Sequence, residues 1–340
     1  MDYKEKLEEI SDQASQEFVN EKNLNTMADK WANVEFETKS WRSTGTYIVS
    51  GASVDEAQTL LDEHLVKTQT MKGHPYAKEF EGRIIEWEKW LLSALAIIEK
   101  WTKVQKNWLY LEPVFTSEDI LQQLPNEGKL FREVDKSWRS MMEKVNLDKK
   151  ALSVTKIENI KENLDENHQK LENVSKRLKQ YLETKRMKFP RFFFLSDEEL
   201  LEILSETKDP TRVQKYLGKC FDGIDFLEFD SEKKIHAMLS KEKEKVGLEK
   251  VIDPVLAKGC VELWLLELED DMILSIKETI KRTLEDYKVT ERKNWVSKWQ
   301  TQCILCGSQV FWTYEVEEAM KTAGIKGTEE YSNKQRERVK

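Results

Sequence analysis

A long stripe of large apolar residues on one helical face constrains this chain more than any other sequence feature. Between Phe80 and Trp108 apolar side chains recur at steps of three and four residues, the repeat of an amphipathic α-helix. The stripe covers about 28 residues, or ~42 Å of helix at 1.5 Å per residue. A second stripe runs from Ile157 to Leu182. Helices of this length predict a mainly α fold, an elongated helical rod of long bundles.

Smaller elements interrupt the long helices. Alternating apolar and polar residues predict a short β-hairpin between Val34 and Val49 and a small β-meander within residues 224–248. The other predicted features are a charged helix over residues 2–30, helix starts at the capping boxes Ser53–Glu56 and Ser196–Glu199, caps at Asp209 and Asp253 before proline, a last helix from about Gln302 to Lys321, and a polar, frayed tail after Gly324.

Composition excludes several classes of protein. The 340 residues include only 12 Gly and 6 Pro, about half the average share, which argues against an all-β fold with many tight turns. The net charge of −8 argues against a nucleic-acid partner, because phosphate affinity rests on clustered Lys and Arg. The longest strongly apolar stretch, Leu91–Ile98, is too short to span a membrane. With four cysteines and no signal region, we expect an intracellular, reducing compartment.

The chain offers no recognisable catalytic, cofactor or metal site. A phosphate-binding loop needs a glycine five residues before its Gly-Lys pair, and neither Gly128-Lys129 nor Gly218-Lys219 has one. Cys303 and Cys306 have the spacing of half a zinc site but lack the other half, so they are interpreted as buried free cysteines. The histidines are dispersed: His64, His74, His168 and His236. We therefore predict no catalytic residue, cofactor or metal, and expect the isolated chain neither to bind nor to hydrolyse ATP.

Two sets of aromatic residues are candidate functional residues. Consecutive Phe residues cannot share one helical face, so the segment Phe189–Leu195 is predicted to be a buried connector, covered from more than one side. The predicted core residues of this connector are Phe189, Pro190, Arg191, Phe192, Phe193 and Phe194. The chain also contains 11 Trp, and Trp101, Trp108 and Trp138 are candidates for rings that meet another domain.

A candidate hinge lies between the two helical stripes. This break is polar, with Asn146, Asp148, Lys149 and Lys150, so we expect few buried contacts to resist its opening. The alternative hinge is the end of the second stripe, at Lys188–Pro190. We favour the first, because the Phe-rich connector is expected to be rigid.

Several stretches of the chain resemble the linker region of dynein heavy chains. The most specific is Phe-Pro-Arg-Phe-Phe-Phe-Leu-Ser-Asp-Glu-Glu, which begins at Phe189 and continues to Leu204. Upstream, Trp108–Phe115 and Thr44–Ile48 fit the same family, and downstream Phe311–Thr313 does. The likeness covers nearly the whole chain, from about residue 25 to 320. The sequence of these stretches is most similar to that of axonemal, inner-arm heavy chains.

Two positions depart from the pattern of that family. Lys243 stands where the family usually has a turn glycine, and Gln300-Thr301 stand where it usually has Pro-Gly. These departures put the local turn geometry in question, but not the family.

The resemblance implies a mechanical role. In dyneins the linker is a curved helical lever that lies across an ATPase ring and moves the tail as the nucleotide in the ring changes. It further implies that the parent protein is an ATP-driven microtubule motor, located in the cytoplasm or cytoskeleton, in a ciliary or flagellar axoneme. The implied partners are the AAA+ ring of the same heavy chain and, through the adjoining tail, dynein intermediate and light chains. Contact with microtubules would be only indirect. The implied divisions are an N-terminal helix at the end of the tail over residues 1–24, the halves of the linker over 25–150 and 151–323, and a polar tail over 324–340.

Two alternatives remain open. A passive, spectrin-like helical tether would also contain long Trp-bearing helices, although it should show a repeat of fixed period, and none is visible. An enzyme with an unrecognised site is the other alternative, against which the missing His and Ser constellations count.

Overall fold

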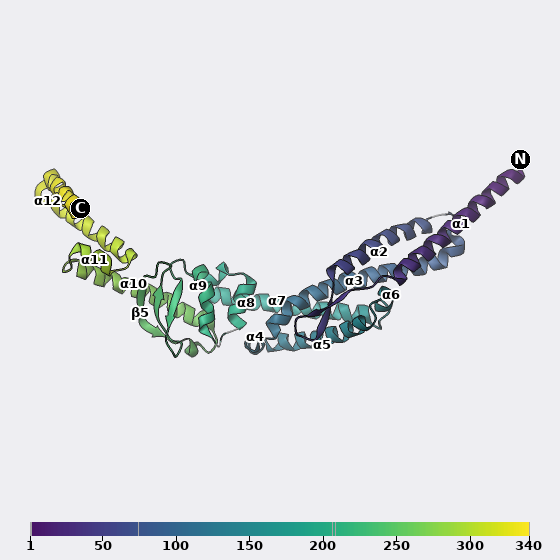
Figure 1. Cartoon of the computed structure of the whole chain (residues 1–340), viewed down its shortest axis with the longest axis horizontal. Coiled ribbons are helices and arrows are strands. Elements are labelled where there is room, and N and C mark those ends of the chain that lie inside the picture. The colour runs from purple at the N-terminus through teal and green to yellow at the C-terminus, as the bar shows by residue number, and fades with distance from the viewer. Residues whose placement is uncertain (1, 74, 206, 208, 340) are drawn as a thin grey trace. The chain divides into compact units, whose positions relative to one another are not determined.

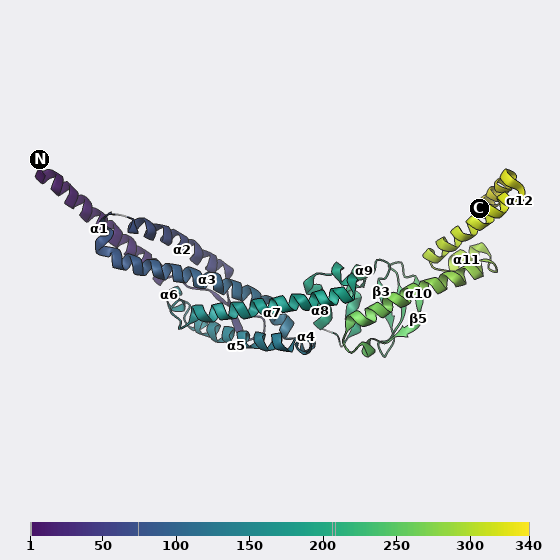
Figure 2. The same ribbon diagram turned by 180° about the vertical axis from the view of Figure 1, so that it is seen from behind.

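The computed structural model describes residues 2–73, 75–205, 207 and 209–339. α-Helices make up most of this part, and small antiparallel sheets interrupt them (Figure 1 and, from behind, Figure 2). The predicted mainly α fold with small β insertions is confirmed. The chain divides into two compact units, Met1–Gln180 and Tyr181–Lys340. The resemblance implies a different division, between two halves of a linker after residue 150, and that division stays a prediction.

The first unit consists of long helices and one short hairpin. Its helix α3 carries the predicted apolar stripe and buries it, with Leu91, Trp101 and Trp108 at most 1% exposed. In chain order its elements are α1 (Asp2–Ala32), β1 (Thr38–Trp41), β2 (Thr46–Val49), α2 (Gly51–Lys72), the 3₁₀ helix η1 (Pro75–Phe80), α3 (Glu81–Phe115), α4 (Glu118–Gln123), α5 (Pro125–Leu147), α6 (Ala151–Val154) and the larger part of α7 (Ile160–Lys188).

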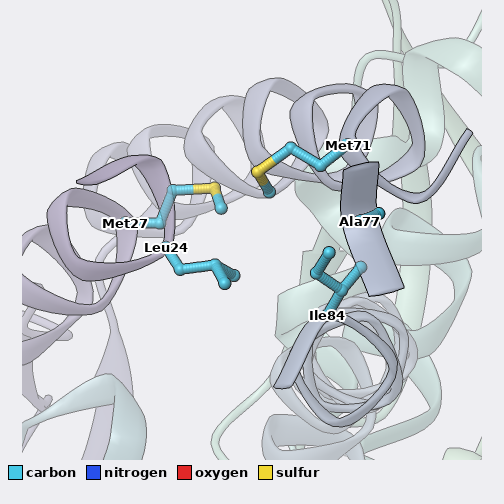
Figure 3. Close-up of a cluster of buried hydrophobic side chains, with 5 residues drawn as sticks. All are labelled: Leu24, Met27, Met71, Ala77 and Ile84. Carbon is cyan, nitrogen blue, oxygen red and sulfur yellow. The ribbon is translucent and has the colours of Figure 1, made fainter. Parts of the chain in front are cut away.

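Helices that are distant in sequence meet in a small hydrophobic cluster of the first unit. Figure 3 shows side chains from α1, α2, η1 and α3 pointing toward one another, and all are at most 7% exposed. These residues are Leu24, Met27, Met71, Ala77 and Ile84. Burying a Leu, Ile or Met side chain contributes about 1.5–3 kcal/mol. The cluster therefore holds the C-terminal part of α1 against the helices that follow it.

The predicted hairpin is confirmed as the antiparallel pair β1–β2, with Thr38 opposite Val49. The predicted capping box at Ser53 is wrong, because α2 begins earlier, at Gly51. The Ser53 hydroxyl instead accepts a hydrogen bond from the Glu37 amide at 3.2 Å and donates one to the Ser50 carbonyl at 2.9 Å. Its side chain thus joins the helix to the chain before β1.

The second unit combines helices with a three-stranded sheet. In chain order its elements are the end of α7, the 3₁₀ helix η2 (Pro190–Phe194), α8 (Asp197–Ser205), η3 (Pro210–Val213), α9 (Gln214–Cys220), β3 (Phe226–Phe229), β4 (Ile235–Leu239), β5 (Lys245–Ile252), η4 (Pro254–Ala257), α10 (Val261–Tyr287), α11 (Arg292–Lys298) and α12 (Thr301–Val339).

The predicted meander is confirmed as an antiparallel sheet of order β3-β4-β5. Helix α10 covers β5 with polar side chains. The Glu249 amide donates to the Ser275 hydroxyl at 2.9 Å, and the Lys250 amide donates to the Asp271 carboxylate at 3.3 Å. These bonds satisfy strand amides that have no further strand to pair with.

The predicted helix caps have mixed outcomes. Ser196 and Glu199 form the reciprocal capping box, each amide donating to the other side chain, at 3.1 and 3.2 Å. Asp209 caps η3 as predicted. Asp253 caps the short helix η4, whereas the long helix α10 begins only at Val261.

The predicted frayed tail is wrong, because α12 continues as helix to Val339. Gly324 interrupts it with φ 59° and ψ −137°, and divides it into two arms. A Cβ on Gly327 would lie 2.3 Å from the Ala319 carbonyl oxygen, so only glycine lets the arms come this close. Gln335 also donates to Glu315 across the arms at 3.1 Å. These contacts hold a polar segment that its composition alone would leave frayed.

Candidate functional site

The C-terminal turn of α7 carries a buried ion pair of the second unit. Lys185 Nζ lies 2.6 Å from Glu262 Oε1 at the start of α10, and their side chains are 7% and 0% exposed. Lys188 Nζ, on the more exposed side, lies 3.6 Å from the same oxygen. Burial and the nearby Glu262 carboxylate raise the pKa of Tyr181, so its phenol is protonated beneath the Lys185 ammonium.

The energetics of this pair are asymmetric. Removing one partner of a buried pair costs about 3–5 kcal/mol, whereas replacing both by apolar residues is often neutral. Glu262 Oε2 is buried and accepts no hydrogen bond from the residues that the structure describes. The pair therefore contributes mainly to specificity: it defines which turn of α7 meets the first turn of α10.

Arg186 ties the end of α7 to the 3₁₀ helix that follows. Its guanidinium donates to the carbonyls of Phe192 at 3.4 Å and Leu195 at 3.0 Å. It also forms an ion pair with Asp197 at 2.7 Å, with the arginine side chain 13% exposed. One side chain thereby binds two carbonyls at the end of η2 and the first residue of α8.

Arg191, within η2, makes the connection onward. Its Nε donates to Glu269 of α10 at 3.0 Å, and Nη1 donates to the Cys220 carbonyl at 3.0 Å. Its guanidinium lies over the Phe221 ring, 4.8 Å from the centroid. The predicted connector is therefore fastened to α9 and α10 by an arginine as well as by its rings.

The Phe residues of the connector divide into a buried set and an exposed set. Phe189, Phe192 and Leu195 are at most 4% exposed, and the Phe189 and Phe192 rings pack edge to face with centroids 4.9 Å apart. Phe193 and Phe194 are 61% and 69% exposed and Pro190 is exposed too, so the predicted burial of these residues is wrong. The reason is the 3₁₀ geometry, because three residues per turn place every third side chain on one face and turn the others away.

The tryptophans predicted to meet another domain are core residues of the first unit. Trp101, Trp108 and Trp138 are at most 1% exposed, so that interpretation is wrong. Trp108 and Trp138 stack with centroids 5.7 Å apart, and Trp108 Nε1 donates to Asp135 Oδ1 at 3.0 Å. Trp101 packs edge to face against Phe36 at 5.2 Å.

The candidate hinge is bound to the first residue of β1 and to the segment before it. Thr38 Oγ1 donates to Asn146 Oδ1 at 2.7 Å, and the Phe36 amide donates to the Lys149 carbonyl at 2.8 Å. Glu35 and Lys150 also form an antiparallel β-bridge. The expectation of few contacts is therefore wrong, because partners about 110 residues away in sequence reach this break. Asp148, the remaining residue of the candidate hinge, lies between these contacts. That the chain bends at this break stays a prediction.

Other candidate chemistry is sparse in the described residues. No group of three or more His, Cys, Asp or Glu side chains there could hold a metal ion. Nor is any described helix both long and apolar enough to cross a bilayer. Burial raises the pKa of Cys220 to about 11 and also raises that of Cys303, so both thiols are protonated at neutral pH.

Comparison with known families then decides the identity. The family described as dynein heavy chain, N-terminal region 2, matches residues 1–283. The chain belongs to the dynein heavy chain family. Similar proteins include dynein axonemal heavy chain 12 of Rattus norvegicus, 46% identical over 329 residues, which are 97% of this chain and 10% of that protein.

Two further relatives agree with this dynein assignment. Dynein axonemal heavy chain 3 of Homo sapiens is 46% identical over 93% of this chain and 8% of its own length. Dynein axonemal heavy chain 1 of Rattus norvegicus is 41% identical over 95% of this chain and 7% of its own length. The dynein chain described here thus spans about a tenth or less of these relatives. The expected location, the cytoskeleton of a ciliary or flagellar axoneme, is confirmed by these axonemal heavy chains.

Neither Lys185 nor Glu262 was among the residues predicted from the sequence of this dynein segment. A basic residue in the last helical turn is common and carries no functional signal. Its partner is 77 residues away, so no local spacing connects the two. Only the contact between α7 and α10 brings them together.

Proposed function

We propose that this dynein segment is part of the linker and acts as a lever between the ATPase ring of the same heavy chain and the tail. Family membership and the long helices support this role. The observation that carries it is α7, a continuous helix of 29 residues. It passes from the first compact unit, which ends at Gln180, into the second.

The anchoring of α7 in the second unit suits a part that transmits force. Lys185 engages α10 through a buried ion pair, and Arg186 binds carbonyls of the connector and forms an ion pair with Asp197 of α8. Phe189 adds an apolar anchor just beyond the helix. A load along α7 would thus reach α10 through several contacts at once, rather than through the chain alone.

In this proposal the chain contributes mechanics and the rest of the heavy chain contributes the chemistry. The AAA+ ring would bind and hydrolyse ATP, and this segment would need neither a catalytic residue nor a cofactor. The adjoining tail would hold the intermediate and light chains. Contact with microtubules would be indirect, through the ring, so the whole protein would be an ATP-driven microtubule motor.

Bending of the lever needs a hinge, for which Asn146–Lys150 stays our candidate. The hydrogen bonds of Asn146 and Lys149 would have to open as it bends. The alternative at Lys188–Pro190 is held by the burial of Phe189 and by the contacts of Arg186.

Fluorescent labels in the full motor can locate the hinge. Lys106 and Ser196 are exposed and suit labelling. We expect the distance between labels at Lys106 and Ser196 to change through the nucleotide cycle. A constant distance would place the hinge outside residues 106–196 and remove both candidates.

The lever and a passive tether predict different results for a motor with a broken anchor. Lys185→Met in the full heavy chain should leave ATP turnover in place and slow microtubule gliding, because force is lost between α7 and α10. Lys281→Met is the matched control, since Lys281 pairs on the surface with Glu278 of α10 and is 66% exposed. Unchanged gliding by the Lys185 variant, at normal expression, would favour the tether and contradict the lever.

A further inference from the structure

An open groove lies between the two arms of α12, the end of α10 and the start of α11. Its volume is about 950 Å³, within the range of ligand and peptide pockets. The residues that matter for recognition are Tyr287, Arg292, Leu305, Trp312, Tyr331 and Arg336. All belong to the second unit. None takes part in the anchoring of α7 described above, and the inference that follows does not rest on the lever role.

The floor of the groove is apolar and uncovered. Leu305 and Trp312 are 58% and 60% exposed, and a spacing of seven residues places them on one face of α12. Tyr287 is held in position by stacking on Phe311, with centroids 4.0 Å apart. An exposed Trp beside other apolar rings in a concave surface is typical of a binding site rather than of scattered surface residues.

Two guanidinium groups line the same groove. Arg292 lies 5.9 Å from the ring centroids of both Tyr287 and Trp295, and its Nη2 lies 3.5 Å from the Ser308 hydroxyl. Among the described residues, neither Arg292 nor Arg336 forms an ion pair. The nearby carboxylate of Glu315 already accepts hydrogen bonds from Tyr287 and Gln335. The groove thus offers two positive charges to an incoming group.

We propose that this groove binds an acidic amphipathic helix of a partner polypeptide. Its apolar stripe would cover Leu305 and Trp312, in the manner of a helix laid in a hydrophobic groove. Its carboxylates would pair with Arg292 and Arg336, because guanidinium groups bind carboxylates with two parallel hydrogen bonds. Charge selects this occupant: a basic helix would meet two arginines, and an uncharged one would leave them unpaired.

The test uses the full 340-residue chain and a designed helical peptide as the probe. The peptide has about 20 residues, enough for a stable helix, with Leu at i, i+3, i+4 and i+7 and Glu beside them. We expect saturable binding by fluorescence anisotropy. Arg292→Glu together with Arg336→Glu should weaken it about tenfold or more, and the same peptide with Lys in place of Glu should then bind better to this variant than to the original chain.

Control variants distinguish binding in this groove from non-specific binding. Lys241→Glu reverses one charge, as each of the arginine changes does, at an exposed position outside the groove, and should leave binding unchanged. Trp312→Ser should weaken binding by both peptides, since it removes apolar surface and no charge. Binding that is indifferent to the arginine changes, or absent altogether, would overturn the proposal. Self-association of the chain that the Glu peptide disperses would also overturn it, because a second copy would then be the occupant.

Discussion

Helix α3 in the first unit and helix α10 in the second are both long and central, yet their buried faces differ in chemistry. α3 buries Leu91, Trp101 and Trp108, with stacked and edge-to-face rings around them. α10 buries polar groups as well: Glu262, Asp271, Ser275, Thr279 and Thr283. Apolar surfaces attract without direction, whereas buried polar groups must each meet a partner. The contribution of α3 to stability should therefore depend mainly on packed volume, and that of α10 also on the pairing of polar groups.

The largest effect should follow from removing a ring of the first unit. Trp108→Ala deletes the stack on Trp138 and leaves a cavity, so we expect a loss of about 3–5 kcal/mol in unfolding free energy, measured with urea. Phe193→Ala is the control, because its ring is 61% exposed and its loss should cost less than about 1 kcal/mol. Equal losses would contradict the division into buried and exposed rings.

Breaking the buried pair tests the dependence of the second unit on pairing. Lys185→Met removes the buried partner of Glu262 and leaves it only Lys188, which is 3.6 Å away and 52% exposed, so we expect a loss of about 3 kcal/mol. Adding Glu262→Leu should recover most of this loss, since an apolar pair of similar volume needs no partner. Urea unfolding of the single and double variants measures the coupling. Additive losses would show that the two charges do not act as a pair.

Acid should weaken the first unit before the second. Burial lowers the pKa of His64, whose Nδ1 accepts a hydrogen bond from Trp31 at 2.9 Å. The unfolded chain takes up a proton near pH 6.5 and the folded chain does so only at lower pH. Stability from His64 is therefore complete above about pH 6.5 and is lost as the pH falls toward the folded pKa.

Asp286 supplies the comparison in the second unit. Hydrogen bonds from Lys298, Trp299 and Thr290 lower its pKa to about 2. Its contribution is present above about pH 4 and is lost as the pH falls toward 2. Urea unfolding at several pH values should show that His64→Asn flattens the dependence between pH 7 and 5, whereas Asp286→Asn changes only the range below about pH 4. If His64→Asn changed only the range below about pH 4 and Asp286→Asn the range from pH 7 to 5, the prediction that acid weakens the first unit before the second would be wrong.

The smallest effect concerns one turn of the sheet in the second unit. Lys243 has φ 67°, in the left-handed region, between the strands β4 and β5. A side chain there costs about 1–2 kcal/mol, partly offset by the greater freedom of glycine in the unfolded chain. Lys243→Gly should therefore raise the unfolding free energy by about 0.5–1 kcal/mol in a thermal melt. Lys241→Gly in the same turn, where φ is not positive, should lower it instead.

Local patterns predicted much of the fold. The stripe from Phe80 to Trp108 needs only a repeat of three and four residues to indicate a helix and its buried face. The capping box at Ser196 and the alternation in β4 are equally local. The identity of the family was also visible in runs such as Phe189–Leu204. Lys243, which stands where the family usually has glycine, has φ 67°, a conformation that glycine adopts without strain.

The errors arose where contacts reach across the sequence. Ser53 was predicted as a cap, but the Glu37 amide occupies its hydroxyl. The break at Asn146 was polar in sequence and bonded in the structure, because Thr38 lies beside it. Phe193 was placed in the core because the sequence did not show that a 3₁₀ turn, with three residues in each turn, would expose it.

The class of the protein follows from local patterns: long amphipathic helices, small β insertions and membership in the dynein family. The pairing of polar groups instead depends on how the helices pack. Lys185 and Glu262 resemble many other exposed charges along their helices until α7 and α10 pack together. The physical reason is that helical periodicity is a property of neighbouring residues, whereas desolvation of a charge depends on what covers it.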